Sequence, residues 1–359
     1  MTRERLDIAF FGSSLVSAYW NGAATYYRGI VRALSDLGHR VTFYEPDAYD
    51  RQKHRDLADP PWARVVVYSA DGEAGVYGAL EQARAADVII KASGVGVFEE
   101  LLEREVLAAR RPGKKAGFCD VDAPATLERV HANAADPFRP LVPQYDFVFT
   151  YGGGDPVVRD YLGLGARTCV PIYNALDPDT HHPAPPDPRF AADLSFLGNR
   201  LPDREARVDE FFFRPAAALA ARSFLLAGNG WGDKAMPGNV KYLGHLYTAD
   251  HNAFNCSALC VLNVHRESMA RYGHSPATRF FEAAGAGACM ITDALEGIDA
   301  FLEPGAEVLI ARTGDEVAAH LAALTPERAA AIGRAGQARI LAQHTYRHRG
   351  SELERLLLA

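Results

Sequence analysis

Residues 258–293 read ALCVLNVHRESMARYGHSPATRFFEAAGAGACMITD, and this stretch decides the fold. Its two ends, ALCVLNV and ACMITD, are short apolar runs that predict buried strands. Between them, apolar residues recur at helical spacing from 277 to 284. Ser275 suits the N-cap and Pro276 the first helical position, so we expect the helix to begin there. A strand, a helix and a second buried strand predict a βαβ unit of a parallel sheet.

The same pattern extends over nearly the whole chain. Proline-rich residues 176–192 have no apolar period and predict a linker. We therefore expect two doubly wound, Rossmann-like α/β domains at 1–175 and 193–340, facing a central cleft. Residues 341–359 predict a helix that packs back across the domain junction. The predicted strands are LDIAFF, RVTFYE, RVVVYS, DVIIKA, KAGFCD, DFVFTY and RTCVPI in the first domain, and DLSFLG, RSFLLAG, VKYLG, ALCVLNV, ACMITD and EVLIA in the second.

Composition excludes several classes of function. The chain is 48% hydrophobic and 23% charged, as in soluble globular proteins, and its net charge of -7 argues against a nucleic-acid partner. No apolar run approaches the about 20 residues that span a bilayer. A strand is predicted almost at the first residue, so we expect no signal peptide and a cytoplasmic protein. The five cysteines lie mainly in apolar runs and predict buried thiols. Cys256 and Cys260 lack zinc-like spacing, so no metal site is expected.

Polar residues at 275, 278, 279 and 282 form the face of the predicted helix opposite its apolar stripe. Ligands of parallel sheets bind beyond the carboxyl ends of the strands, which is where this helix starts. The amides of Ser275 and Thr278 and the charge of Arg279 suit an anion. Glu282 can accept hydrogen bonds from two hydroxyls. Together they predict a sugar-phosphate site, and the alternative is an intrahelical Arg–Glu pair on a solvated face.

Three segments resemble a known family, the CgeB-like glycosyltransferases of the GT-B (two Rossmann domain) superfamily. They are FLGNRLPDRE, YLGHLYTADHNAFNCSALCVLNVHRESM and GHSPATRFFEAAGAGACMITDALEGIDAFLEPGAEVLIA. In the first domain, NGAATYYRGIVRALSDLGHRVTFYE and YDFVFTYGGGDPVVRDYLGLGA are similar to family segments. The resemblance implies a nucleotide-diphosphate sugar donor, of UDP or dTDP type, in the second domain and an acceptor in the first.

The third segment is similar to the block in which retaining GT-B enzymes carry two glutamates separated by seven residues. The second glutamate matches Glu282, which the resemblance implies holds the donor ribose. The first would fall at His274, so the chain departs from the pattern and the stereochemistry stays open. Gly198, Asn199 and Arg200 match the turn that approaches the diphosphate; the alternative for Arg200 is a surface side chain. His245, Arg266 and His274 are further candidate contacts, although histidines at strand ends also serve structural roles.

Candidate acceptor and cleft residues follow strands of the first domain. Asp120 and Asp122 come after KAGFC; one suits a helix N-cap, and Asp120 is our first choice as general base. Gly12 and Gly22 lie in the loop after the first strand. Tyr151 and Gly152 open a glycine run after another strand. For all the glycines, an ordinary turn is the alternative.

The resulting hypothesis is a glycosyltransferase that moves a sugar to a hydroxyl of a carbohydrate or similar acceptor. Arg279, Asp120 and His274 form the predicted catalytic set. We expect no permanently bound cofactor and no metal, because cationic side chains replace one at the diphosphate. Retention is favoured, while inversion with Asp120 or Asp122 stays open. The alternatives are a sugar-nucleotide epimerase on the same scaffold and a non-catalytic nucleotide-binding protein; the oligomeric state is not predicted.

Overall fold

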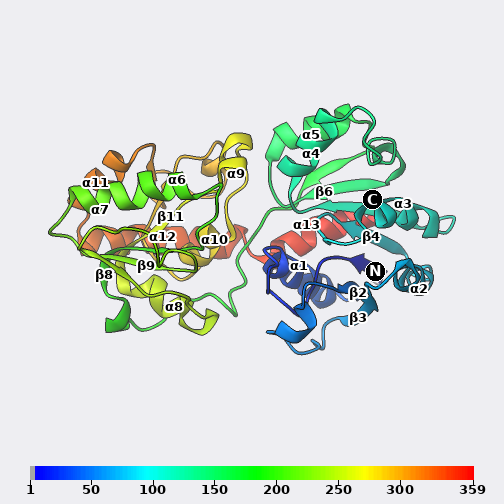
Figure 1. The fold of residues 1–359 in the computed structure, drawn as a ribbon, viewed down its shortest axis with the longest axis horizontal. Coiled ribbons are helices and arrows are strands. Elements are labelled where there is room, and N and C mark those ends of the chain that lie inside the picture. The colour runs from blue at the N-terminus through cyan, green and yellow to red at the C-terminus, as the bar shows by residue number, and fades with distance from the viewer. Residues whose placement is uncertain (1–4) are drawn as a thin grey trace. The chain divides into compact units, whose positions relative to one another are not determined.

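The computed structural model describes residues 5–359 and divides into two compact units (Figure 1). The first unit comprises Met1–Tyr173 together with Tyr346–Ala359, and the second comprises Asn174–Thr345. The segment 176–192, which we predicted as a linker, is part of the second unit. The predicted boundary at 340 lies inside helix α12, Pro326–Gln343.

The first unit is built on a seven-stranded parallel sheet of order β3-β2-β1-β4-β5-β6-β7. Each strand coincides with one predicted apolar run, β2 extending two residues beyond its run, and the buried aromatic and β-branched side chains face helices on both sides. The strands are β1 Asp7–Phe11, β2 Arg40–Asp47, β3 Arg64–Ser69, β4 Val88–Ala92, β5 Lys115–Asp120, β6 Phe147–Thr150 and β7 Cys169–Pro171.

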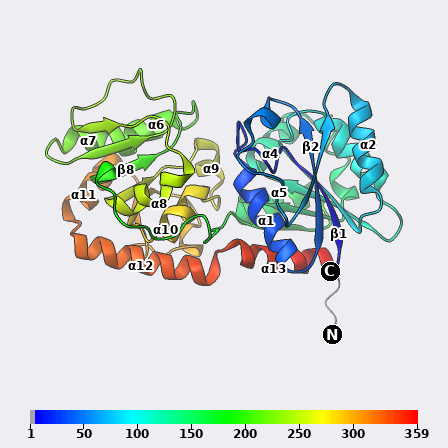
Figure 2. The same cartoon turned by 90° about the horizontal axis from the view of Figure 1, so that it is seen from below.

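Helices of the first unit come from both ends of the chain. Helix α13, Tyr346–Leu358, lies alongside α1, Ala24–Asp36 (Figure 2). Gly350 makes this contact possible, because a Cβ there would lie 2.6 Å from the Cβ of Ala33. The remaining helices are α2 Glu73–Ala83, α3 Glu99–Ala109, α4 Ala123–Ala132 and α5 Gly154–Gly163.

The second unit has a six-stranded parallel sheet of order β10-β9-β8-β11-β12-β13. Its strands also match the predicted runs, so the two doubly wound sheets expected from the sequence are confirmed. They are β8 Ala192–Leu197, β9 Phe224–Ala227, β10 Val240–Tyr242, β11 Ala258–Asn263, β12 Met290–Asp293 and β13 Leu309–Ala311. Across residues 5–359, no helix has both the length and the apolar character needed to cross a membrane.

Helices cover this sheet around a core that contains the fully buried Trp231. The short helices α6 and α7 flank a π-helical turn, Asp209–Phe213, whose three phenylalanines enter that core. The helices are α6 Glu205–Val208, α7 Arg214–Ala218, α8 Thr248–Ser257, α9 Glu267–Tyr272, α10 Thr278–Gly285, α11 Gly314–Ala323 and α12.

Candidate functional site

The strand order of the second unit reverses between β8 and β11. In open parallel sheets, ligands bind outside the carboxyl ends of the strands at such a point. Gly198, Asn199 and Arg200 directly follow β8, and Arg266 follows β11. Helix α10 connects β11 to β12, so it belongs to the same edge. The topology therefore brings the predicted donor residues of these three segments to one edge of one sheet.

Helix α10 begins later than the sequence predicted. Ala277 is its N-cap residue and has an extended backbone (φ −61°, ψ 152°), so the predicted start at Ser275 is wrong. The amide of His274 donates to the carbonyl of Glu296 (2.7 Å), which ties the preceding segment to the loop after β12. The predicted apolar face is correct, because Phe280 and Phe281 are fully buried. The first amides of α10 now belong to residues from Thr278 onward.

Arg279 and Glu282 form an intrahelical pair, but not on a solvated face. Nη2 of Arg279 lies 3.5 Å from Oε2 of Glu282, and the side chains are only 16% and 11% exposed. Burial raises the pKa of Glu282, yet Arg279, His181 and His251 outweigh it and hold that pKa below its ordinary value. Nη1 of Arg279 is buried with no hydrogen-bond partner. The pair therefore keeps an unsatisfied guanidinium nitrogen, which an anionic ligand would satisfy.

A third cationic side chain lies beside Arg279 and Arg266. Burial lowers the pKa of Arg204, the nearby carboxylates of Asp203 and Asp293 act against it, and the positive charges of Arg266 and Arg279 lower it further. Nε of Arg204 is buried without a hydrogen-bond partner. Arg266 donates from Nε to Asp203 (2.6 Å). This arginine cluster (Arg204, Arg266, Arg279) therefore lies beside carboxylates, but it still has guanidinium nitrogens without a partner, on Arg204 and Arg279, that suit a phosphate.

Arg200, which the resemblance assigned to the diphosphate, is already engaged. Its guanidinium donates to Glu205 (2.7 and 2.8 Å) and to Asp233 (2.9 Å). Hydrogen bonds from Arg200 and Lys234 lower the pKa of Glu205 to about 2. These bonds, with one to the carbonyl of Gly230, use most of the N–H donors of Arg200, whereas Arg204, at the other end of the same turn, has a nitrogen without a partner.

The turn after β8 is held by its neighbours. The carbonyl of Gly198 accepts from Nε1 of Trp231 (2.8 Å), and the side chain of Asn199 accepts from the amide of Asn229 (2.9 Å). Gly228 has a φ of +121°, and a Cβ there would lie 2.3 Å from the Gly198 carbonyl oxygen. A side chain at 228 would thus displace the turn that carries the predicted donor contacts.

The predicted histidine contacts lie in exposed or strained positions. His245 is exposed and packs edge-on against Tyr247, which is 72% exposed at the start of α8. His274 has a positive φ of 47°, unusual for a residue with a side chain. Its imidazole lies against Gly297, where a Cβ would collide with Nδ1 at 1.9 Å. The backbone strain at His274 marks a position that the surrounding structure specifies strongly.

Behind this edge, Asp293 at the end of β12 is completely buried and paired. Its carboxylate lies 2.5 Å from Nδ1 of His265 and accepts from Nη2 of Arg207 (2.6 Å). Burial raises the pKa of Asp293, but His265 and Arg207 together hold it below its ordinary value. These residues form a structural network under the site.

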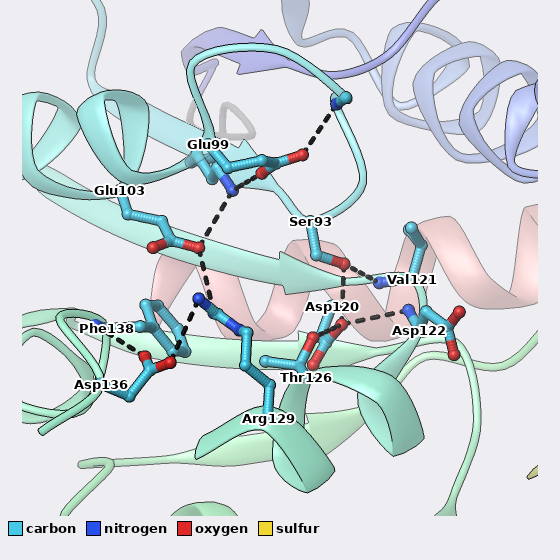
Figure 3. Close-up of polar contacts among 12 residues, drawn as sticks. Ser93, Glu99, Glu103, Asp120, Val121, Asp122, Thr126, Arg129, Asp136 and Phe138 are labelled. Carbon is cyan, nitrogen blue, oxygen red and sulfur yellow. Dashed lines mark hydrogen bonds and ion pairs between the residues drawn. The ribbon is translucent and has the colours of Figure 1, made fainter. Parts of the chain in front are cut away.

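In the first unit, Asp120 is 1% exposed and its carboxylate is surrounded by donors (Figure 3). Oδ1 accepts from Ser93 Oγ (2.7 Å), Thr126 Oγ1 (3.0 Å) and the amide of Asp122 (3.1 Å), while Oδ2 accepts from the hydroxyl of Tyr161. A general base must reach the proton of its substrate. This geometry therefore favours a structural role for Asp120, which ties β4, β5, α4 and α5 together.

The other predicted residues of the first unit lie at the carboxyl ends of its strands. Asp122 occupies the N-cap position of α4. Gly12 packs under the ring of Phe43, whereas Gly22 is exposed. Tyr151 is partly buried with its ring 5.6 Å from that of Tyr26. The Gly152 carbonyl accepts from Thr150 Oγ1 (2.7 Å).

Sequence reasoning missed residues that the structure places at these edges. Arg204 lies in the segment NRLPDRE, in which the sequence analysis chose Arg200, so the same segment could have indicated Arg204 as well. His181 and His251 approach Glu282 from distant segments. The only sequence signal was the pair of adjacent histidines in the proline-rich segment, to which His181 belongs. Trp20, 79% exposed in the loop after β1, follows Tyr19, whose ring stacks on His54 at 4.0 Å.

A cavity of about 960 Å³ lies at the opposite edge of the first sheet. Residues near the starts of β1, β2 and β3 line it, including Asp7, Arg40 and Arg64. Ligands of this class of fold bind at the carboxyl edge, so this cavity does not compete with the candidate site.

Comparison with known proteins agrees with this architecture. Residues 204–355 match a family model described as glycosyl transferase-like. A search of curated protein sequences gave no significant match. Sucrose-phosphate synthase from Thermosynechococcus elongatus has a TM-score of 0.68 at 13% identity over 98% of each chain. Anabaena HepE in complex with UDP-glucose has a TM-score of 0.66 at 13% identity, over 98% of this chain and 99% of that chain.

A third similar structure is an alpha-glucosyltransferase in complex with UDP-glucose and DNA containing an abasic site. Its TM-score is 0.71 at 11% identity, over 99% of this chain and all of that chain (100%). Identities this low establish a shared fold rather than a shared substrate. The chain has the GT-B fold, as the sequence predicted.

Proposed function

We propose that the protein transfers a sugar from a nucleotide-diphosphate sugar to a hydroxyl of an acceptor. The observation that carries this proposal is the arginine cluster at the carboxyl edge of the second sheet. Two of its guanidinium groups have buried nitrogens without partners, and the cluster lies beside the start of α10. The GT-B fold and the glycosyl transferase-like match over residues 204–355 support the same reaction class.

The donor diphosphate would lie between Arg204, Arg279 and the first amides of α10. Free amides at a helix start add hydrogen bonds and a favourable dipole for an anion. Glu282, one turn into the helix, would accept hydrogen bonds from the ribose hydroxyls. Exposed Tyr247 and His245 offer rings on which a base can stack. A UDP donor is the first choice, because similar structures were solved with UDP or UDP-glucose.

Chemistry would depend on stabilising the leaving nucleotide diphosphate. Negative charge grows on the diphosphate as the glycosidic bond breaks, and preorganised cations in a partly buried site lower that barrier by several kcal/mol, on the order of 3 to 4 for one donor. Arg279 and Arg204 are the proposed source of this effect, so the chemical step itself requires no metal ion. Retention, with the diphosphate assisting deprotonation of the acceptor, is the favoured outcome, and His274 is the proposed contact to the transferred sugar.

The acceptor would bind the first unit, at the loops that follow β1, β5 and β6. Its proposed contacts are Gly12, Gly22, Asp122, Tyr151 and Gly152. Exposed Trp20 adds an apolar ring of the kind that packs against the faces of sugars. The net charge of -7 disfavours a nucleic-acid acceptor, so a carbohydrate is the proposed class.

One experiment separates this function from its two alternatives. A thermal-shift panel of nucleotides and nucleotide sugars identifies the donor, because a ligand stabilises the folded state by an amount that rises with its concentration relative to its Kd. The donor is then incubated with the enzyme, with and without a mixture of carbohydrate acceptors, and the released nucleotide diphosphate is measured. A transferase releases it faster when acceptor is present. An epimerase would convert the donor alone, and a binding protein would release none; either result overturns the proposal.

A further inference from the structure

Three side chains of the second unit converge on one point that the proposed donor site leaves unexplained. His181 comes from the segment before β8, His251 from the first turn of α8, and Glu282 from α10. One potential ligand atom from each lies within 4.8 Å of the other two. Nε2 of His181 is 3.7 Å from Oε1 of Glu282, and the two imidazole centroids are 5.8 Å apart.

One ring nitrogen of each histidine has no hydrogen-bond partner. Nε2 of His181 and Nδ1 of His251 are both buried and unsatisfied. The rings are nevertheless oriented from behind: Nδ1 of His181 lies 3.1 Å from the hydroxyl of Thr180, and the backbone of Leu246 hydrogen-bonds the ring of His251. Histidines that bind metals are oriented in this way, with one nitrogen fixed by a neighbour and the other free for the ion.

The carboxylate of Glu282 has one oxygen on the side of the histidines. Oε1 lies 3.7 Å from Nε2 of His181, whereas Arg279 approaches the other oxygen, Oε2, at 3.5 Å. A neutral imidazole and an ionised carboxylate are the forms in which these side chains bind a metal ion.

We propose that His181, His251 and Glu282 bind a divalent transition-metal ion with the preferences of zinc. Two imidazoles and one carboxylate suit Zn²⁺, whereas Mg²⁺ and Ca²⁺ prefer oxygen ligands. Tetrahedral ligands with bonds of about 2.0 to 2.2 Å lie ~3.4 Å from one another. The 3.7 Å between His181 and Glu282 needs only a small closure to reach that geometry. Three protein ligands leave the fourth position to water.

The ion would fix Glu282 without replacing it as a donor contact. With Oε1 on the metal, Oε2 stays beside Arg279 and remains available to a hydroxyl, since a carboxylate has about four lone-pair sites. The ion would also attach the segment around His181 to α8 and α10. This proposal departs from the sequence analysis, which expected no metal; its two histidines lie outside every predicted contact.

The test uses the full chain without a polyhistidine tag, stripped with chelator and dialysed against Zn²⁺. Metal content is measured for the wild type, His181→Ala, His251→Ala and the control His182→Ala, whose histidine is exposed beside the site. We expect about one ion per chain in the wild type and the control, and at least a tenfold lower content in the other two. Co²⁺ loading should give visible absorption that the same two variants lose.

Equal zinc content in the wild type and His181→Ala would overturn the metal site, as would no zinc in a wild type that melts cooperatively. The UDP affinity of the metal-free proteins separates the metal-site proposal from the proposed donor site, because loss of the metal site leaves the arginine cluster intact. We expect His181→Ala to keep UDP affinity within about threefold of the wild type, a small free-energy change. A larger loss in the absence of metal would make these histidines nucleotide contacts instead.

Discussion

Replacing Arg204 by methionine should separate ligand binding from stability. The substitution keeps most of the apolar stem and removes a guanidinium whose Nε is buried without a partner. Burial is the largest cause of its lowered pKa, with the charges of Arg266 and Arg279 acting in the same direction and those of Asp203 and Asp293 in the opposite one. Removing the buried cation therefore removes a desolvation cost, and we expect the melting temperature to stay within about 4 °C of the wild type or to rise.

UDP binding, in contrast to stability, should weaken in Arg204→Met. A charge-assisted hydrogen bond contributes about 1.5 to 3 kcal/mol, and each 1.4 kcal/mol is tenfold in affinity. Arg204→Met should therefore weaken UDP binding by roughly 10- to 150-fold, measured by isothermal titration calorimetry. The matched control is Arg222→Met, which removes a cation paired with Asp193 near the amino ends of β8 and β9. This control should bind UDP like the wild type.

Two results would refute the reasoning about Arg204. Unchanged UDP affinity in Arg204→Met would show that the arginine cluster is not the anion site. A large drop in melting temperature, with equal loss of affinity, would mean that Arg204 stabilises the fold and acts on binding only indirectly.

Three further predictions concern the surrounding structure. Asp120→Asn should lower the melting temperature by several degrees, because four donors lose a charged acceptor, a cost of about 1 to 3 kcal/mol. A lower kcat at unchanged stability would instead indicate that Asp120 acts as the general base. Gly228→Ala should weaken UDP binding, measured by calorimetry, because the added Cβ displaces the turn at Gly198. The control Gly238→Ala should bind UDP like the wild type, because a Cβ there meets no other atom. Asp293 has a lowered pKa in the folded state, so its stabilisation is present above the unfolded value of about 4 and lost as pH falls through the folded one. Urea unfolding between neutral and acid pH should show a shallower loss in Asp293→Asn, and parallel curves would contradict the pairing.

The fold followed from local pattern because buried parallel strands have a strong local signature. Runs such as DVIIKA and ALCVLNV are apolar on both faces, and helices of the right length separate them. The start of α10 was less predictable. Ser275 and Pro276 satisfy the local rules for a helix start, but the backbone bond from His274 to Glu296 ties this segment to the loop after β12, and no local pattern encodes that contact.

The site was predictable only where neighbours in sequence are neighbours in space. Arg279 and Glu282 share a turn of helix, so their pairing could be anticipated. Arg200 and Arg204 share one short turn, and the sequence analysis chose Arg200 as the diphosphate contact. The two arginines are distinguished only by the carboxylates that accept hydrogen bonds from Arg200. His181 and His251 reach Glu282 from segments far away in the chain, which no local pattern encodes.

The central claim is that the second unit binds the donor diphosphate with its arginine cluster. A crystal structure of the protein with UDP tests it most directly. We predict phosphate oxygens within about 3 Å of guanidinium nitrogens of Arg204 and Arg279, and ribose hydroxyls beside Glu282. Nucleotide bound elsewhere, with Arg204 still lacking a partner and Arg279 contacting only Glu282, would contradict the account.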